Sequence, residues 1–313
     1  MLGKTANGLF WLFRNIERTE NTARLLDTGL RIALTRSSGN DEEWISVLAT
    51  AGAQASYDLK HDTVSGSSVI DFLLRDKTNP ASVISVLESA RNNARTVRTA
   101  LTREVWESVN EAWMELDATL KPAIKDRELP ALLESIRQQS ARMRGALHGT
   151  MLRNDMYNFC RLGTFVERAD ATARILDVKY YVLLPSLAYV GSSLDNVQWE
   201  SILRSVSAHR SYRWAYDDDY HAATIADFMI LNSRMPRSLA FCYNKIVSNL
   251  GYLMSDYDAR HPCHDHAEAI RERLRGKHVQ EIFDQGLHQF IQDFIRDNNR
   301  LGHLIDEAYR FNS

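Results

Sequence analysis

The sequence predicts an all-α protein, a single helical bundle built from a tandem duplication. Only 6 prolines and 14 glycines interrupt the 313 residues, and no stretch has the alternation of β-branched and aromatic residues that a sheet needs. FWLFRNIERTENTARLLD (10–27) and CRLGTFVERADATARILD (160–177) match at a constant offset of 150. We therefore expect one domain over 1–313, with repeat halves 1–150 and 151–313 related by a pseudo-two-fold axis.

Two further blocks repeat in the same order along the chain. Residues 44–57 (WISVLATAGAQASY) match residues 199–212 (WESILRSVSAHRSY), and residues 71–83 (DFLLRDKTNPASV) match residues 227–239 (DFMILNSRMPRSL). The offsets grow slowly, as short insertions after a duplication would produce. A polar residue kept in both copies meets the same local environment twice, which makes it a candidate functional residue.

The helices can be placed from periodicity and from proline. The first should cover about residues 5–35, where apolar residues recur at intervals that keep one face. Helices should begin at the prolines of 79–80 and 235–236, because proline fits a first helical turn. One long helical tract should then run to about residue 121. Another, from about residue 129, should continue almost unbroken into the second copy, so that long helices join the halves. Trp44 and Trp199, at matching positions, should both be buried.

The composition is that of a soluble globular protein, with 44% apolar and 25% charged residues. The net charge of −2 provides no basic field for a nucleic acid backbone. Cys160, Cys242 and Cys263 lie far apart, which suits a reducing cytosol better than a disulfide scaffold. The longest apolar run, 180–190, is too short to span a bilayer. We expect a cytoplasmic protein with no nucleic acid or membrane partner.

A charged face recurs in both copies. Glu17, Asn21 and Arg24 fall within about 60° of one another on a helical wheel, and Phe10 and Phe13 share that face. Three interpretations are open: a salt-bridge network inside the bundle, a site for a ligand or partner, and a solvated surface. The candidate polar cleft comprises Glu17, Arg18, Asn21, Arg24, Glu167, Arg168 and Arg174. Within it we expect Arg18 and Arg168 to be structural and the Glu17/Arg24 and Glu167/Arg174 faces to line the cleft.

Two other features could bind an anion. Arg91, Arg95 and Arg98 form a basic stripe at helical spacing, which could receive a carboxylate or phosphate or could pair with neighbouring acids. Arg237 and Ser238 follow a proline at a predicted helix start, and helix N-termini can bind anions. A simple capping turn is the favoured interpretation of that second feature.

Several classes of site are not supported. No Glu-x-x-His occurs, which excludes a ferritin-type di-iron centre. His261, Cys263, His264 and His266 could hold zinc or copper, but they have no counterpart in the first half, and an incidental polar loop is favoured. The chain has no GxSxG elbow and no glycine-rich phosphate loop. We therefore expect no metal and no cofactor, and the catalytic residues, if any, are unknown.

Three tracts resemble the bacterial alpha-E domain family: MLGKTANGLFWLFRNIERTENTARLLD, ARNNARTVRTALTREVWESVN and DFMILNSRMPRSLAFCY. The resemblance covers essentially the whole chain. It implies an all-helical protein encoded beside, or fused to, a circularly permuted ATP-grasp ligase, often with a transglutaminase-like protein nearby. The implied role is in ATP-dependent amide or peptide ligation, with the ligase supplying the nucleotide chemistry. The copies differ at two points: Ala81 stands where the second has Arg237, and Thr164 stands where the first has Arg14.

Function hypotheses of three classes follow. The chain could bind the ligase or its amino-acid or peptide substrate, it could be an enzyme acting through the Glu and Arg clusters, or it could be a scaffold. Catalysis requires the charged faces to converge on a water-accessible pocket. Faces that diverge or are sealed favour the binding or structural role.

Overall fold

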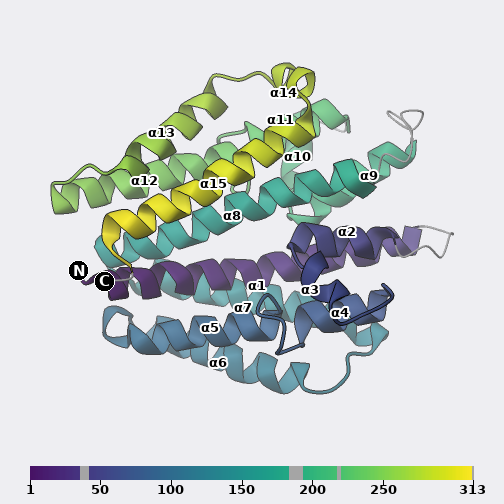
Figure 1. Ribbon diagram of the computed structural model, residues 1–313, viewed down its shortest axis with the longest axis horizontal. Coiled ribbons are helices and arrows are strands. Elements are labelled where there is room, and N and C mark those ends of the chain that lie inside the picture. The colour runs from purple at the N-terminus through teal and green to yellow at the C-terminus, as the bar shows by residue number, and fades with distance from the viewer. Residues whose placement is uncertain (36–41, 183–192, 217–219, 312–313) are drawn as a thin grey trace.

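The computed structural model describes residues 1–35, 42–182, 193–216 and 220–311. Over these residues it contains helices and connecting loops, with no strand (Figure 1). The all-α fold class is therefore confirmed. The helices are α1 (Gly3–Thr35), α2 (Glu42–Ala51), α3 (Gln54–Asp58), α4 (Gly66–Leu74), α5 (Val83–Thr96), α6 (Arg103–Leu120), α7 (Leu129–Thr150), α8 (Asp155–Val182), α9 (Ser193–Ser205), α10 (His209–Tyr216), α11 (Ala222–Ile230), α12 (Leu239–Tyr257), α13 (Pro262–Arg275), α14 (Val279–Gln285) and α15 (Leu287–Tyr309), with short 3-10 turns η1 (Arg98–Ala100) and η2 (Asp126–Glu128).

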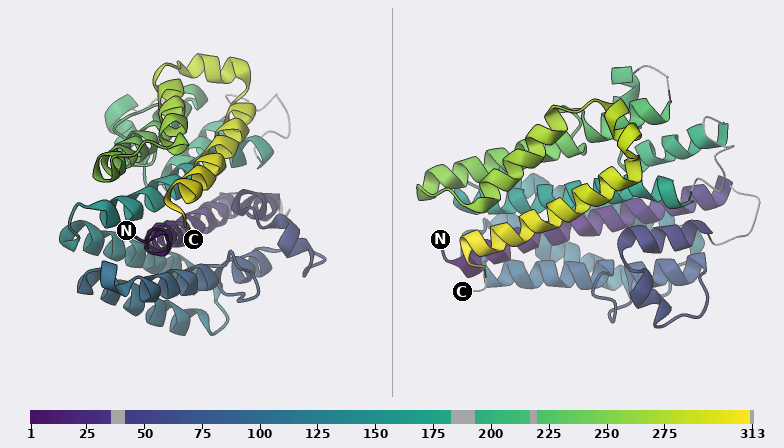
Figure 2. Two further views of the ribbon diagram at one scale, coloured as in Figure 1. Left: turned by 60° about the vertical axis from the view of Figure 1, so that its left-hand side comes forward. Right: turned by 45° about the horizontal axis from the view of Figure 1, so that its top comes forward.

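The two long helices α1 and α8 lie side by side at the centre of the molecule and run in the same direction (Figures 1 and 2). They approach closely at Gly163 of α8, where a Cβ atom would lie 2.1 Å from the carbonyl oxygen of Phe10. A side chain at this position would collide with backbone, which cannot move aside easily. The glycine therefore permits the contact between the two central helices.

Each central helix is covered by its own group of helices. On one side α5 and α7 pack against α1, with α6 against both, and on the other side α12 and α15 pack against α8, with α13 against both (Figure 1). The short helices α2 to α4 and α9 to α11 gather at one end of the molecule. The two ends of the described chain meet at the other end (Figure 2), where Gly3 packs on the backbone of Arg310. One hydrophobic core runs through both halves.

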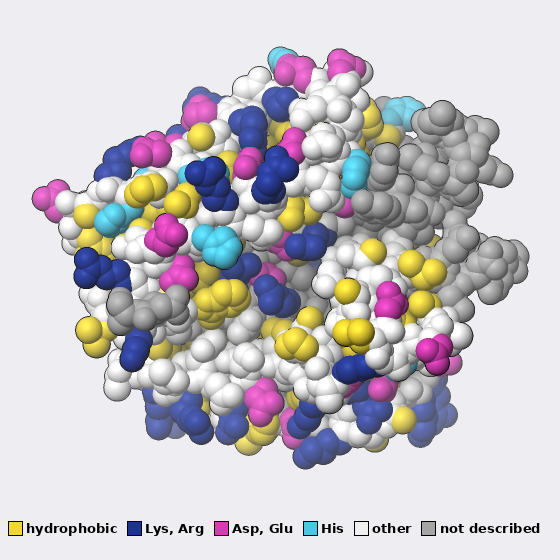
Figure 3. Space-filling model, viewed as in Figure 1, with side chains coloured by type: hydrophobic (Ala, Val, Ile, Leu, Met, Phe, Trp, Pro, Cys, Tyr) yellow, Lys and Arg dark blue, Asp and Glu magenta, His cyan; other side chains and the backbone are white. Residues whose placement is uncertain are grey.

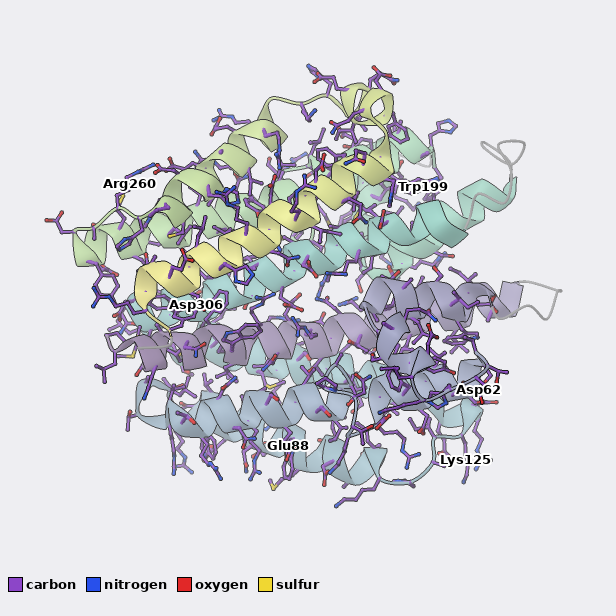
Figure 4. All side chains as sticks on the ribbon, in the orientation of Figure 1. Asp62, Glu88, Lys125, Trp199, Arg260 and Asp306 are labelled. Carbon is purple, nitrogen blue, oxygen red and sulfur yellow. The ribbon has the colours of Figure 1, made fainter. Side chains whose placement is uncertain are left out.

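Matching positions of the repeated blocks have matching local structure. Trp44 on α2 and Trp199 on α9 (Figure 4) are both buried, at 5% and 3% exposure, as predicted. Helices α2 and α9 are each followed by a residue with positive φ, Gly52 at 66° and Ser207 at 55°. These similarities agree with a duplication. The pseudo-two-fold relation of the entire halves stays a prediction, which superposition of the halves tests.

The helices after the two prolines start later than predicted. Ser82 and Ser238 are the N-cap residues of α5 and α12, and their hydroxyls accept hydrogen bonds from the N–H groups of Ser85 and Phe241 at 3.3 and 3.0 Å. The prolines lie in the preceding turn. A serine N-cap stabilises a helix start through this hydrogen bond, so the capping interpretation of Ser238 accounts for its position.

The two continuous helical tracts predicted from the sequence are each broken. After α5 the chain turns back through η1, and α6 begins after Thr102, whose hydroxyl accepts a hydrogen bond from the Val105 N–H at 3.4 Å. Helices α7 and α8 are separated at residues 151–154, where the Asn154 side chain accepts from the Tyr157 N–H at 3.3 Å. Both breaks lack glycine and proline. The signal that was overlooked is the capping residue at each new helix start.

No helix in the described ranges combines the length and the apolar character that crossing a bilayer requires. Most of the apolar run 180–190 lies outside those ranges.

Candidate functional site

The two Glu-Arg dipeptides of the repeat pair with each other across the α1–α8 contact. Arg18 donates to both carboxylate oxygens of Glu167, from Nε at 2.6 Å and from Nη2 at 2.9 Å. Arg168 donates to both oxygens of Glu17 in the same way, at 2.8 and 2.9 Å. Bidentate pairs of this kind are strong and directional. Each dipeptide thus supplies the acid of one pair and the base of the other, and the reciprocal pairs join the two halves.

Arg237 closes one side of this network. It follows Pro236 in the turn before α12, and its guanidinium donates to three groups of α1: Glu17 Oε1 at 3.1 Å, Asn21 Oδ1 at 3.0 Å and Glu20 Oε1 at 2.6 Å. Glu17 is 1% exposed and Glu20 0%. Arg237 was a candidate anion-binding residue, and in the structure the side chains of Glu17, Glu20 and Asn21 of α1 occupy its donors.

Two further arginines complete the cluster around Glu20. Arg24 donates to Glu20 Oε1 from Nε at 2.9 Å and from Nη2 at 2.6 Å, and its Nη1 donates to the Ser207 hydroxyl at 2.7 Å. Arg144 of α7 forms an ion pair with the same carboxylate and reaches Glu17 Oε2 at 3.5 Å. Glu20 therefore contacts three arginines, counting Arg237, and its carboxylate is buried beneath them.

The buried glutamates are held ionised. Burial alone would raise the pKa of Glu17, but the guanidinium groups of Arg168, Arg237 and Arg144 hold it well below its usual range. Burial would likewise raise the pKa of Glu167, yet Arg18 and its neighbours lower it from 4.5 to about 2. A carboxylate with so low a pKa is a poor proton acceptor at neutral pH.

The equivalent acids on α8 are less crowded. Glu167 receives Arg14 Nε at 2.9 Å in addition to Arg18. Asp170, at the position of Glu20, contacts one arginine only: Arg174 Nε donates to Oδ2 at 2.6 Å and Nη2 approaches Oδ1 at 3.4 Å. No other hydrogen bond to Asp170 is found over the described residues. Its Oδ1 therefore keeps most of its capacity to accept.

A cavity of about 270 Å³ opens beside Asp170, and we refer to it as the α1–α8 cavity. Its walls come from α1, α8, the end of α2, Leu73 of α4 and the turn before α5. Within the described chain, Nη1 of Arg18 and Nη1 of Arg174 donate to no protein group, and Nδ2 of Asn21 is buried without a partner. The polar residues of the wall are Arg18, Asn21, Thr22, Thr50, Glu167, Asp170 and Arg174. The cavity thus offers both cationic donors and a carboxylate.

A wider groove of about 530 Å³ lies on the other side of α1, between α1, α7 and the α9–α10 turn. Arginines outnumber acids six to three on its walls, so this arginine groove favours anionic groups. Arg24 and Arg144, which pair with Glu20, also line this groove. The remaining arginines of the groove are Arg31, Arg137, Arg204 and Arg210, and its acids are Glu20, Asp27 and Glu134.

The predicted stripe of arginines, on α5 and the start of η1, does not join either opening. Arg91 stacks on Trp113 at 4.1 Å, Arg98 lies over Trp106 at 5.3 Å, and Arg95 is exposed. In Figure 3 lysine and arginine side chains gather along the lower edge of the molecule, over α5 and α6. Arg91, Arg95 and Arg98 line neither the α1–α8 cavity nor the arginine groove.

The histidine-rich segment is the start of α13 and not the loop that was expected. His261 is the N-cap residue, and His264 and His266 lie within 3.1 and 2.9 Å of backbone carbonyl groups of α12 and α15. Burial raises the pKa of the Cys263 thiol to about 12. Over the described residues, no group of three potential ligands among His, Cys, Asp and Glu is arranged to hold a metal ion.

Sequence comparison of the repeats overlooked three residues of the site. Glu20 and Asp170 occupy matching positions but differ in identity, so a search for identical residues passes over them. A comparison of the two copies by side-chain charge instead of residue identity would have found both. Arg144 comes from α7, which has no repeated block, and nothing in the sequence indicates that it reaches Glu20.

The family described as a predicted alpha-helical domain with a conserved ER motif matches residues 1–309. The chain belongs to the Alpha-E family. The ER motif of that description occurs here as Glu17-Arg18 and again as Glu167-Arg168. In this Alpha-E chain the two copies bind each other.

The curated relatives that match this Alpha-E chain include two mycobacterial proteins. Uncharacterized protein Mb2597 of Mycobacterium bovis and uncharacterized protein Rv2567 of Mycobacterium tuberculosis are each 22% identical to it over 297 residues. The alignment covers 89% of this chain and 33% of each relative, so the chain spans about a third of their length. No solved structure matches the chain.

Proposed function

We propose that this Alpha-E chain is a non-catalytic component of an ATP-grasp-associated amide- or peptide-ligation system. In this proposal the α1–α8 cavity holds the amino-acid or peptide substrate that the ligase joins. The observation that carries the proposal is that one cavity contains both guanidinium donors without a protein acceptor among the described residues, on Arg18 and Arg174, and a carboxylate oxygen of Asp170 that is only weakly engaged. A free amino acid brings both an ammonium and a carboxylate, and a peptide end brings one of them, which these groups complement.

The sequence context supports the same proposal. The chain lacks a glycine-rich phosphate loop, so nucleotide chemistry would come from a partner. The curated relatives continue well beyond the matched third, which leaves room for a fused ligase domain. The proposed partner is a circularly permuted ATP-grasp ligase, with a transglutaminase-like protein as a second member of the system.

An independent enzymatic role has less support. Glu17 is sealed by arginines, and both oxygens of Glu167 are engaged in ion pairs with the pKa of that carboxyl lowered to about 2. Burial raises the pKa of the Cys242 thiol to about 12, so it is a poor nucleophile at neutral pH. A purely structural role would account for the reciprocal pairs but not for the unused donors beside them.

The proposal is tested by co-purification followed by reconstitution. The tagged chain is expected to retain the neighbouring ATP-grasp protein, and ligation of amino acids by that protein is expected to require the chain. Isothermal titration should also show saturable binding of an amino acid or dipeptide to the chain alone. A ligase that works equally well without the chain would contradict the proposal. A complex whose Alpha-E chain binds no amino acid or dipeptide would support the scaffold role instead.

A further inference from the structure

We infer that the ligand of the α1–α8 cavity presents a cationic group, a guanidinium or a protonated amine, to Asp170, in the place that the Arg237 side chain fills in the other half. The inference deepens the proposed function, on which it rests, because it names the group by which the substrate is recognised. It depends on the correspondence of positions between the repeats and on the contacts around each.

The cavity lies where an arginine is missing from the first repeat. Arg237 follows Pro236, and the residue at the matching position after Pro80 is Ala81, which lines the cavity. The three residues that bind the Arg237 guanidinium have counterparts 150 positions later that also line the cavity. The contacts of Arg237 are Glu17, Glu20 and Asn21, and the counterparts are Glu167, Asp170 and Ala171.

A second substitution between the repeats widens the same space. In the second half the hydroxyl of Ser207 accepts a hydrogen bond from Arg24 at 2.7 Å. The matching residue, Gly52, is exposed and lines the cavity without a side chain. A Cβ atom at Gly52 would lie 3.6 Å from Nη1 of Arg174. Two side chains that fill the second-half site are thus absent from the first-half site, and both absences fall on one cavity.

The ion pairs leave an acceptor for a cation there. Glu20 contacts three arginines, whereas among the described residues Asp170 contacts Arg174 alone, and its Oδ1 is engaged only at 3.4 Å. A cationic ligand would give Asp170 a partner of the kind that Arg237 gives Glu20. The unused donors of Arg18 and Arg174 then remain for an anionic group on the same ligand.

The first-half site is also the more favourable place for a mobile cation. Burial lowers the pKa of Arg237 to about 10 even though Glu17 and Glu20 raise it, so its fully buried position disfavours the charged form. The side chains of Arg18 and Arg174 at the cavity keep 35% and 33% exposure. A cation that binds to Asp170 in this cavity therefore loses less of its hydration than the Arg237 guanidinium does in its buried site.

Isothermal titration of the purified chain with four compounds tests the inference. L-arginine carries a guanidinium, an ammonium and a carboxylate; agmatine lacks the carboxylate; L-alanine lacks the guanidinium; N-acetylglycine carries only the carboxylate. We expect L-arginine to bind at least about ten-fold more tightly than N-acetylglycine, one factor of ten corresponding to about 1.4 kcal/mol. L-alanine shows whether an ammonium suffices without a guanidinium, and agmatine, which carries both cations, shows whether the carboxylate is required.

Variants locate the binding in the cavity. Ala81→Arg supplies the missing side chain and should reduce the affinity for the tightest cationic compound at least ten-fold, and Asp170→Asn should do the same without filling the space. Ala118→Arg, an equivalent change at an exposed position on α6, should leave the affinity unchanged. In the other half, Arg237→Ala should create a second cavity. Millimolar guanidinium chloride should then raise the melting temperature of the Arg237→Ala variant relative to sodium chloride at equal ionic strength.

The outcomes separate the inference from the proposed function. Tight binding of N-acetylglycine with no binding of the cationic compounds overturns the inference and leaves a substrate site in place. Unchanged affinity in both Ala81→Arg and Asp170→Asn overturns the inference by placing the site elsewhere. Absence of binding for all four compounds, together with ligation that does not require the chain, overturns both.

Discussion

Replacement of Glu17 by glutamine should destabilise the fold severely. The change keeps the size of the side chain but removes the charge that two buried arginines, Arg168 and Arg237, share. These arginines are 8% and 7% exposed, and Glu17 is 1% exposed, so water cannot replace the lost partner. Removal of one member of a buried ion pair costs about 3–5 kcal/mol. At about 2 °C per kcal/mol for a chain of this size, the melting temperature should fall by roughly 6–10 °C.

Thermal unfolding followed by circular dichroism measures this effect. The matched control is Glu107→Gln on α6, whose carboxylate pairs with the exposed Arg103, and its melting temperature should equal that of the wild type. The double variant Glu17→Gln with Arg168→Met should be less unstable than the sum of the single variants, because it removes an unpaired buried charge. A Glu17→Gln chain that melts with the wild type would refute the account of the reciprocal pairs.

Three further outcomes are expected. Glu167 titrates near 4.5 when unfolded and near 2 when folded, so its contribution to stability is complete above the first value and is lost as the pH falls through the second; urea unfolding across that range should show the decline, and Glu167→Gln should flatten it. Gly163→Ala should destabilise the chain by at least about 1–3 kcal/mol in urea unfolding, because its Cβ would meet the Phe10 carbonyl; wild-type stability would mean that α1 and α8 do not pack this closely. Trp199→Ala should cost about 3–5 kcal/mol, and an unchanged unfolding midpoint would show that this side chain is not in the core.

Much of the fold could be predicted because the repeat marks equivalent positions. Trp44 and Trp199 are buried as their matching places required, and the first helix ends where its periodicity ends. The turns at 97–102 and 151–154 were overlooked because Thr102 and Asn154 act through local capping, which leaves helical periodicity largely intact on either side. Propensity alone does not show where a long helix folds back on itself.

The site could be predicted in part. The repeated Glu-Arg dipeptides directed attention to Glu17 and Glu167, but their partners lie on the other copy, and a helical wheel of one helix cannot show a pair across two. A different limit applies to Arg24 and Arg174, which pair with Glu20 and Asp170 four residues earlier on the same helix. These acids were overlooked because they differ in identity between the two copies. The contacts of Arg237 with side chains of α1 depend on packing between segments far apart in the sequence, which no local sequence pattern encodes.

The most direct test of the division between a structural network and a binding cavity is Arg174→Met, assayed for melting temperature and for ligation with the ATP-grasp partner. Arg174 is a third exposed and pairs only with Asp170 in the described structure, so its loss should lower the melting temperature far less than Glu17→Gln does. The account predicts a near-native melting curve together with loss of ligation. A variant that ligates at the wild-type rate, or one that unfolds as readily as Glu17→Gln, would contradict it.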